Sequence, residues 1–146
     1  MIKDELMQDL KAAMKERDTV KKDTVTMLRA AILQVEKDKQ ITLDEDAILE
    51  IVAKEVKKRK EARTEFEKAN RADLVEGLDR EIEILNKYMP KQLTEEEIEA
   101  LVKEAIEEEN ATSPRDMGKV MKNLKPKVAA KADGKLVSEI VKKLLA

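Results

Sequence analysis

The sequence contains no cysteine, no histidine and no tryptophan, and its only aromatic residues are one phenylalanine and one tyrosine. Without cysteine there is no disulfide and no thiolate nucleophile. Without histidine, the commonest zinc ligand and the commonest general base are both absent. We therefore expect no metal site and no cofactor, and a core built from aliphatic side chains.

Long apolar runs and glycine-rich loops are also absent. No segment approaches the roughly 18 apolar residues that a membrane span needs, and the charged N-terminus, MIKDELMQDL, lacks the apolar stretch of a secretory signal. Three scattered glycines cannot form a phosphate-binding loop, and the only two serines are not in a G-x-S-x-G motif. We expect a soluble cytoplasmic protein with no membrane contact, and we find no group of residues that would carry catalysis.

Charged residues are unusually abundant in the sequence. Charged residues make up 42% of the 146 residues, against about 25% in ordinary globular proteins. The charges are segregated: residues 91–110 contain two basic and eight acidic side chains, whereas residues 111–146 contain nine basic and three acidic ones. With six glycines and prolines in total and no alternating strand pattern, the composition predicts an all-α protein.

Apolar spacing predicts about four helices in the first 89 residues. The first covers residues 2–16 with a solvated polar face, and the second ends near Lys37 with Val20 and Met27 on its apolar side. Thr42 and Glu45 form a capping-box pattern that should begin the third helix. A break at residues 69–71 should separate it from the fourth.

The apolar side of the third predicted helix also includes two arginines, Arg59 and Arg63. One interpretation is structural, with their stems on apolar surface and their guanidinium groups on carboxylates of the next helix. The other is a pair of phosphate ligands. Spacing alone leaves both interpretations open.

Pro90 should end the fourth helix, because the residue before a proline is disfavoured in the helical conformation. We therefore predict two domains, an N-terminal helical domain of residues 1–89 and a C-terminal three-helix bundle of residues 90–146. In the second, Thr94 and Glu97 form another capping box.

The two helices that follow have clear start signals. Ser113 should be the N-cap of the sixth helix, with Pro114 at its first helical position. Pro126 should end this helix. A basic loop over residues 125–132 should then lead to Asp133, the N-cap of the seventh helix.

Helix starts attract anions because their amides are unpaired and the helix dipole is positive there. Basic residues and glycines cluster around the starts of the sixth and seventh helices, so this region is a candidate RNA-backbone surface. Its residues are Arg115, Gly118, Lys119, Lys122, Lys125, Lys127, Lys131, Gly134 and Lys135. For each lysine alone, an ordinary solubilising charge is the competing interpretation, and for Gly118 it is close packing of a neighbouring helix.

Several separated motifs resemble the GatB/YqeY family along essentially the whole chain. They are G-K-V-M-K at residues 118–122, K-A-D-G-K-L-V at 131–137, N-R-A-D-L at 70–74 and Y-M-P-K-Q-L at 88–93. The pattern is similar to stand-alone YqeY proteins, and its C-terminal part is similar to the tail domain of the GatB subunit of tRNA-dependent amidotransferases. The family-motif residues are Arg59, Phe66, Arg71, Asp73, Tyr88 and Pro90.

This resemblance implies two helical domains and a link to carbon–nitrogen ligases that use glutamine as amido donor. The tail domain of the amidotransferase contacts tRNA, whereas its catalytic domain has no counterpart in this sequence. We therefore expect an accessory protein that binds tRNA or other RNA through the phosphate backbone. The alternative is a non-catalytic module whose N-terminal helices dock a protein partner.

Overall fold

A computed structural model describes the whole chain, residues 1–146. It contains seven α-helices, one short 3₁₀ turn and no strand, which confirms the all-α prediction. The chain divides into two compact units, Met1–Met89 and Pro90–Ala146, which we call the N-terminal unit and the C-terminal unit. None of the helices has the length and apolar character needed to cross a membrane.

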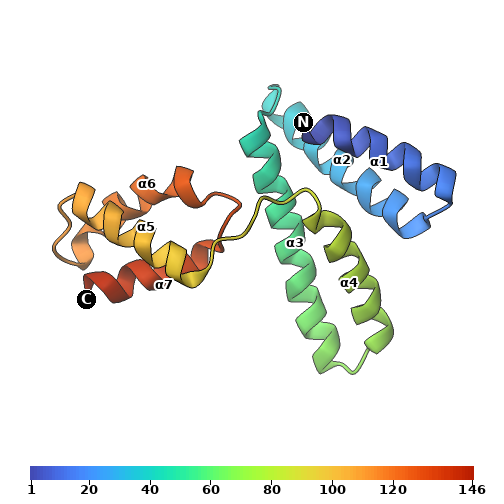
Figure 1. Cartoon of the computed structure of the whole chain (residues 1–146). Helices are drawn as coiled ribbons and strands as arrows, with labels where there is room; N and C mark the ends of the chain where they lie inside the picture. The colour runs from blue at the N-terminus through green and yellow to red at the C-terminus, as the bar shows by residue number, and fades with distance from the viewer. The chain divides into compact units, whose positions relative to one another are not determined.

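Four helices form the N-terminal unit: α1 (Ile2–Glu16), α2 (Thr19–Lys39), α3 (Glu45–Lys68) and α4 (Ala72–Asn86). They make two antiparallel pairs, α1 with α2 and α3 with α4, and α2 also packs against α3 and α4 (Figure 1). The core lies among the four helices and comprises Ile2, Leu6, Val25, Leu28, Ile32, Leu43, Ile48, Val52, Val56, Ile84, Leu85 and Tyr88.

The start of α3 differs from the prediction. Asp44, not Thr42, is the N-cap, and its carboxylate accepts a hydrogen bond from the Ala47 amide at 2.9 Å. Glu45 does not reach back to a cap, because it accepts a hydrogen bond from the Ile2 amide at 2.8 Å. A tertiary contact thus takes the glutamate that the local pattern assigned to capping.

The buried side of α2 was also predicted incorrectly in part. Val20 and Met27 are 42% and 44% exposed, whereas Thr24 and Val25 are buried. The reason is that α2 packs against three helices, so its buried face is set by tertiary contacts and not by the apolar stripe alone.

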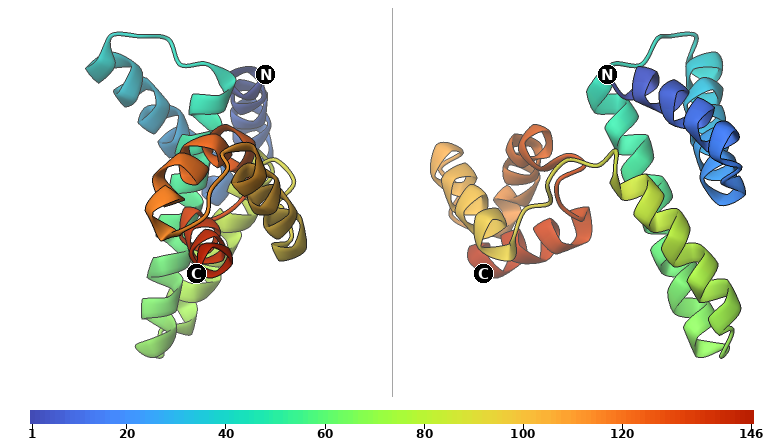
Figure 2. Two further views of the ribbon diagram at one scale, coloured as in Figure 1. Left: turned by 90° about the vertical axis from the view of Figure 1, so that its left-hand side faces the viewer. Right: turned by 45° about the vertical axis from the view of Figure 1, so that its right-hand side comes forward.

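The C-terminal unit contains α5 (Glu95–Glu108), a 3₁₀ turn (Pro114–Asp116), α6 (Met117–Val128) and α7 (Gly134–Leu145), and the three helices pack on one another (Figure 2). Two predicted caps are confirmed. Thr94 Oγ1 accepts from the Glu97 amide at 3.1 Å at the start of α5, and Asp133 accepts from the Lys135 amide at 3.2 Å at the start of α7. The core comprises Ile98, Val102, Ala105, Val120, Leu124, Val128, Val137, Ile140, Val141 and Leu145.

Two expectations about α6 were wrong. Ser113 makes no capping hydrogen bond, and the helix begins at Met117 after the 3₁₀ turn. Pro126 does not end the helix but lies within it, and the ladder continues with the Ala129 amide donating to the Lys125 carbonyl at 3.0 Å. Burial of Val128 in the core favours this last turn, so Lys125 and Lys127 are helical and not part of a loop.

Candidate nucleic-acid interface

One side of α6 carries exposed lysines. Val120, Leu124 and Val128 recur every four residues and face the core. The residues on the opposite side and its flank are exposed, and their side chains form no salt bridge in the structure. We call this surface the lysine face; it consists of Gly118, Lys119, Lys122 and Lys125.

The glycine in the lysine face is not required for helix packing. A Cβ atom built on Gly118 would meet nothing within 4 Å, and the same holds for Gly134 at the start of α7. The competing interpretation of Gly118, close packing of a neighbouring helix, therefore finds no support in the geometry. Open space lies above this turn of α6, beside Lys119 and Lys122.

Lys127 has an internal role and does not belong to the lysine face. Its Nζ lies 3.5 Å from Glu108 Oε2 on α5 and 3.2 Å from Asn123 Oδ1. Asn123 in turn donates to Glu108 at 2.9 Å and to Glu109 at 3.4 Å. The hydrogen bond from Asn123, together with the charge of Lys127, holds the pKa of the Glu108 carboxyl below its usual range. The acidic end of α5 is thus partly neutralised by α6.

Carboxylates of the chain lie beside both predicted anion sites. Asp116 Oδ2 accepts a hydrogen bond from the Thr112 amide at 2.9 Å, and this hydrogen bond lowers the pKa of Asp116. Thr112 precedes the 3₁₀ turn, so its amide does not belong to the start of α6. At the start of α7, the carboxylate of Asp133 accepts a hydrogen bond from the Lys135 amide at 3.2 Å, so one of the amides on which the prediction rested is already paired.

The remaining predicted residues do not form one site. Arg115 is exposed in the 3₁₀ turn before α6, whereas Lys131 and Lys135 flank the start of α7, beyond the other end of α6. At 1.5 Å per residue, α6 separates the two groups by about 18 Å. The structure brings together only the lysine face.

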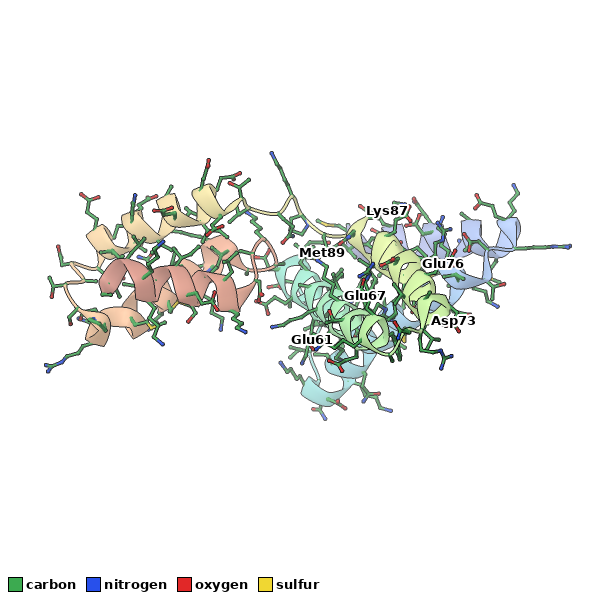
Figure 3. All side chains as sticks on the ribbon, turned by 90° about the horizontal axis from the view of Figure 1, so that it is seen from below. Glu61, Glu67, Asp73, Glu76, Lys87 and Met89 are labelled. Atoms are coloured by element: carbon green, nitrogen blue, oxygen red, sulfur yellow. The ribbon has the colours of Figure 1, made fainter.

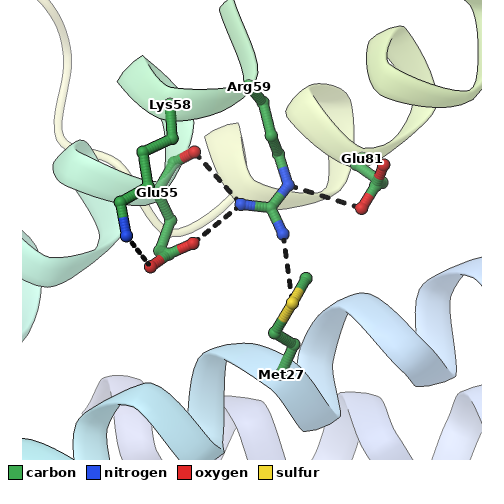
Figure 4. A network of polar contacts seen from close by, with 5 residues as sticks. All are labelled: Met27, Glu55, Lys58, Arg59 and Glu81. Carbon is green, nitrogen blue, oxygen red and sulfur yellow. Dashed lines mark hydrogen bonds and ion pairs between the residues drawn. The ribbon is translucent and has the colours of Figure 1, made fainter. Parts of the chain in front are cut away.

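In the N-terminal unit, the motif residue Arg59 is enclosed by protein groups (Figure 4). It is 8% exposed, and its Nη1 lies 2.9 Å from Glu55 Oε2 one turn earlier on α3. Its Nε donates to Glu81 Oε1 on α4 at 3.4 Å, and its Nη2 lies 3.6 Å from the sulfur of Met27 on α2. The guanidinium group therefore joins three helices and is not presented to a phosphate.

Arg63 repeats the arrangement one turn later. It pairs with Asp79 of α4 and, at 3.0 Å, with Glu67, and the hydrogen bond to Asp79 raises its pKa. Figure 3 shows Glu61 and Glu67 extending from α3, and Asp73 and Glu76 from α4. Both arginines meet carboxylates of the next helix, which favours the structural interpretation over a phosphate-binding pair.

The remaining motif residues lie near the α3–α4 connection and at the boundary between the two units. Arg71 Nε donates to Asp73 Oδ1 at 3.2 Å at the start of α4, and both side chains are exposed. Phe66 is half-buried near the end of α3, and Pro90 follows the last residue of the unit.

Sequence reasoning missed Asp9. The buried hydroxyl of Tyr88 donates to Asp9 Oδ2, and Lys87 Nζ donates to both oxygens of Asp9 at 2.9 Å. Burial raises the pKa of Asp9, but the hydrogen bonds from Tyr88 and Lys87 outweigh this effect and lower it overall. Burial and the neighbouring Asp9 carboxylate raise the pKa of Tyr88.

A signal for this contact was present in the sequence. Asp9 lies three residues after Leu6 and four before Ala13, so it shares their helical face, and both are fully buried. The polar face of α1 is therefore not wholly solvated, because the carboxylate of Asp9 anchors α1 to the end of α4.

Comparison with protein families gives a match over nearly the whole chain. Residues 3–145 match the family model described as Yqey-like protein. The chain belongs to the YqeY-like family. The YqeY resemblance read from the separated motifs is thereby confirmed.

Curated YqeY-like relatives are fungal proteins called "Altered inheritance of mitochondria protein 41, mitochondrial". The protein of Lachancea thermotolerans is 38% identical over 75% of this chain and 60% of its own length. That of Kluyveromyces lactis is 35% identical over the same shares. That of Pyrenophora tritici-repentis is 30% identical over 93% of this chain and 78% of its own length. The chain thus spans about 60% of the length of two of these YqeY-like relatives.

These names contradict the prediction of a cytoplasmic protein, because they describe the relatives as mitochondrial. The prediction rested on the lack of cysteine and of an apolar N-terminal segment. Neither property separates the cytoplasm from mitochondria, since mitochondrial targeting segments are amphipathic and need no apolar stretch.

Proposed function

We propose that the chain binds folded RNA, with tRNA as the first candidate, through contacts between the lysine face of α6 and the phosphate backbone. The observation that carries the proposal is the exposure of Lys119, Lys122 and Lys125 on one side of a helix that contains no acidic residue. From Lys119 to Lys125 the row is about 9 Å long, at 1.5 Å per residue. Cations in such a row replace the counterions of neighbouring phosphates.

The composition of the C-terminal unit restricts the mode of binding. Both aromatic residues, Phe66 and Tyr88, belong to the N-terminal unit, so the C-terminal unit itself contains no ring that could stack on a base. Binding is then governed by RNA shape and charge, and it is weak and strongly dependent on salt. Residues 118–122 and 131–137 resemble motifs of the GatB tail domain, which contacts tRNA in the amidotransferase, and this resemblance is the reason for choosing tRNA.

The test measures binding of unmodified tRNA to the full chain by filter binding between 20 and 200 mM KCl. With three phosphate contacts, the logarithm of the binding constant should fall with a slope of about −2 to −3 against the logarithm of salt. Replacing Lys119, Lys122 and Lys125 together by glutamine should remove most of this slope, about one unit for each lost contact.

A matched control removes the same charge elsewhere. Lys11, Lys15 and Lys39 are exposed on α1 and α2 and form no salt bridge. Their combined replacement by glutamine should leave the slope unchanged. If both triple variants weaken binding equally, net charge alone is responsible and the lysine face has no special role. Absence of any complex at 20 mM KCl overturns the proposal.

A further inference from the structure

A hollow lies between α1 and α2, and it is lined by apolar side chains. It has a volume of about 240 Å³, and Leu6, Met7, Ile32 and Leu33 contribute its apolar walls. Met7 and Leu33 are 38% and 57% exposed even though they line the same depression. Isolated exposed apolar residues are common on protein surfaces, but a group that shares one hollow marks an interaction site.

The apolar row continues beyond the hollow along α1. Met14 is 58% exposed and lies seven residues after Met7, so it projects from the same side of the helix two turns later. At 1.5 Å per residue, Met7 and Met14 are about 10 Å apart along the axis. We call the surface formed by Met7, Met14, Arg29 and Leu33 the methionine groove. Flexible methionine side chains allow such a surface to adapt to a partner.

The edges of the methionine groove are positively charged. Arg29 lines the hollow, is half-buried and has no salt bridge. The other cation of the lining, Lys3, is already neutralised by Glu36 at 2.7 Å. Lys11 on α1 and Lys22 on α2 are exposed without ion pairs, and Asp4 is the single carboxylate in the lining.

We propose that the methionine groove binds an amphipathic helix of another protein, with an apolar face and acidic flanks. An apolar stripe at positions i, i+3, i+4 and i+7 spans about 10 Å, which matches the row from Met7 to Met14. A carboxylate on the flank pairs with Arg29, whose charge has no partner within the chain. A second copy of the chain is a poor occupant, because it would bring two basic edges together.

The test uses two fluorescein-labelled helical peptides of sixteen residues with the same leucine stripe. One has glutamate at its flanking positions and the other has lysine. Polarisation titrations with the full chain should show saturable binding of the glutamate peptide and at least tenfold weaker binding of the lysine peptide. Arg29→Glu should reverse this preference, which a change in folding could not do.

Two further variants locate the site. Leu33→Asp should weaken binding of the glutamate peptide at least tenfold. Val20→Asp is the matched control, since Val20 is 42% exposed on the same helix but does not line the hollow. Its substitution should leave the affinity unchanged.

Methionine methyl NMR gives an independent readout. The glutamate peptide should shift the ε-methyl signals of Met7 and Met14 and leave Met27 in place, since the sulfur of Met27 contacts Arg59. Equal binding of both peptides, or an Arg29→Glu variant with unchanged preference, overturns the proposal. So does a self-associated chain that Leu33→Asp dissociates, or a shift of the same two methyl signals by phosphatidylserine vesicles and not by peptide.

Discussion

The N-terminal unit encloses its motif residues Arg59 and Tyr88, whereas the C-terminal unit exposes the lysines of its motifs. In the first, Arg59 is buried among carboxylates of α3 and α4, and Asp9 lies against the buried Tyr88. In the second, the buried residues are all aliphatic, and Lys119 and Lys122 form no salt bridge. Packing thus accounts for Arg59 and Tyr88 but not for the exposed pair Arg71 and Asp73, and the motif lysines of the C-terminal unit are exposed to solvent.

The largest expected difference between the units comes from removing the buried guanidinium group. Arg59→Ala leaves Glu81 without its cation and Glu55 with only Lys58 at 3.6 Å, and it should lower the free energy of unfolding by about 2–4 kcal/mol. Urea unfolding followed by tyrosine fluorescence reports on the N-terminal unit alone, because Tyr88 is the only tyrosine and there is no tryptophan.

Arg71→Ala is the matched control for Arg59→Ala. Arg71 is also a motif arginine, but its side chain is 56% exposed and pairs only with Asp73 two residues away. Its replacement should leave the unfolding midpoint nearly unchanged. Equal effects of the two substitutions would remove the distinction between buried and exposed motif charges.

A smaller loss should follow from Tyr88→Phe, which removes the hydroxyl donor to Asp9. A hydrogen bond to a charged group contributes about 1.5–3 kcal/mol, and Lys87 still pairs with Asp9, so the loss should be near the lower limit. Unfolding of this variant must be followed by circular dichroism, since the substitution removes the fluorophore.

The effect of Tyr88→Phe should depend on pH. The pKa of Asp9 is lowered in the folded state, so its contribution is complete above the unfolded pKa, about 4, and is lost as the pH falls through the folded pKa. The difference in stability between wild type and variant should be constant near neutral pH and should narrow below pH of about 4. A difference that stays constant down to pH 2 would contradict the role of the Asp9 carboxylate.

The smallest effect on stability is expected from replacing the exposed lysines of the C-terminal unit. Replacing Lys119, Lys122 and Lys125 by glutamine should not change hydrogen exchange of the α6 amides, because these exposed side chains form no salt bridge that would be lost. Peptide-resolved exchange measured by mass spectrometry checks this. Faster exchange in α6 would show that the lysines stabilise the unit, and loss of RNA binding would then have a structural cause.

Local signals in the sequence were sufficient for much of the fold. The bounds of α1 and the caps at Thr94 and Asp133 depend on neighbouring residues and agree with the structure. The predictions were wrong where a tertiary contact changed the local outcome. Glu45 turned to the Ile2 amide, and Val128 packed into the core and carried the helix past Pro126.

The candidate site could be predicted only in part for the same reason. The sequence placed Lys119, Lys122 and Lys125 among nine candidate residues around two helix starts, but the engagement of Lys127 depends on Glu108, which is nineteen residues away. The exposure of Met14 was not foreseen either, because its spacing after Ile2, Leu6 and Leu10 places it on the apolar side of the first helix. Only the packing of α2 against α1 shows which apolar side chains remain exposed to solvent.

The carboxylates of Asp116 and Asp133 at the helix starts bear on the valency of binding. Each carboxylate carries a negative charge close to the lysines, and each is held by a backbone amide, at 2.9 Å for Asp116 and 3.2 Å for Asp133. A single phosphate or sulfate ion would have to compete with these carboxylates. The proposed RNA binding therefore requires several weak contacts spaced along one ligand, and we expect the lysine face to prefer polyanions over single ions.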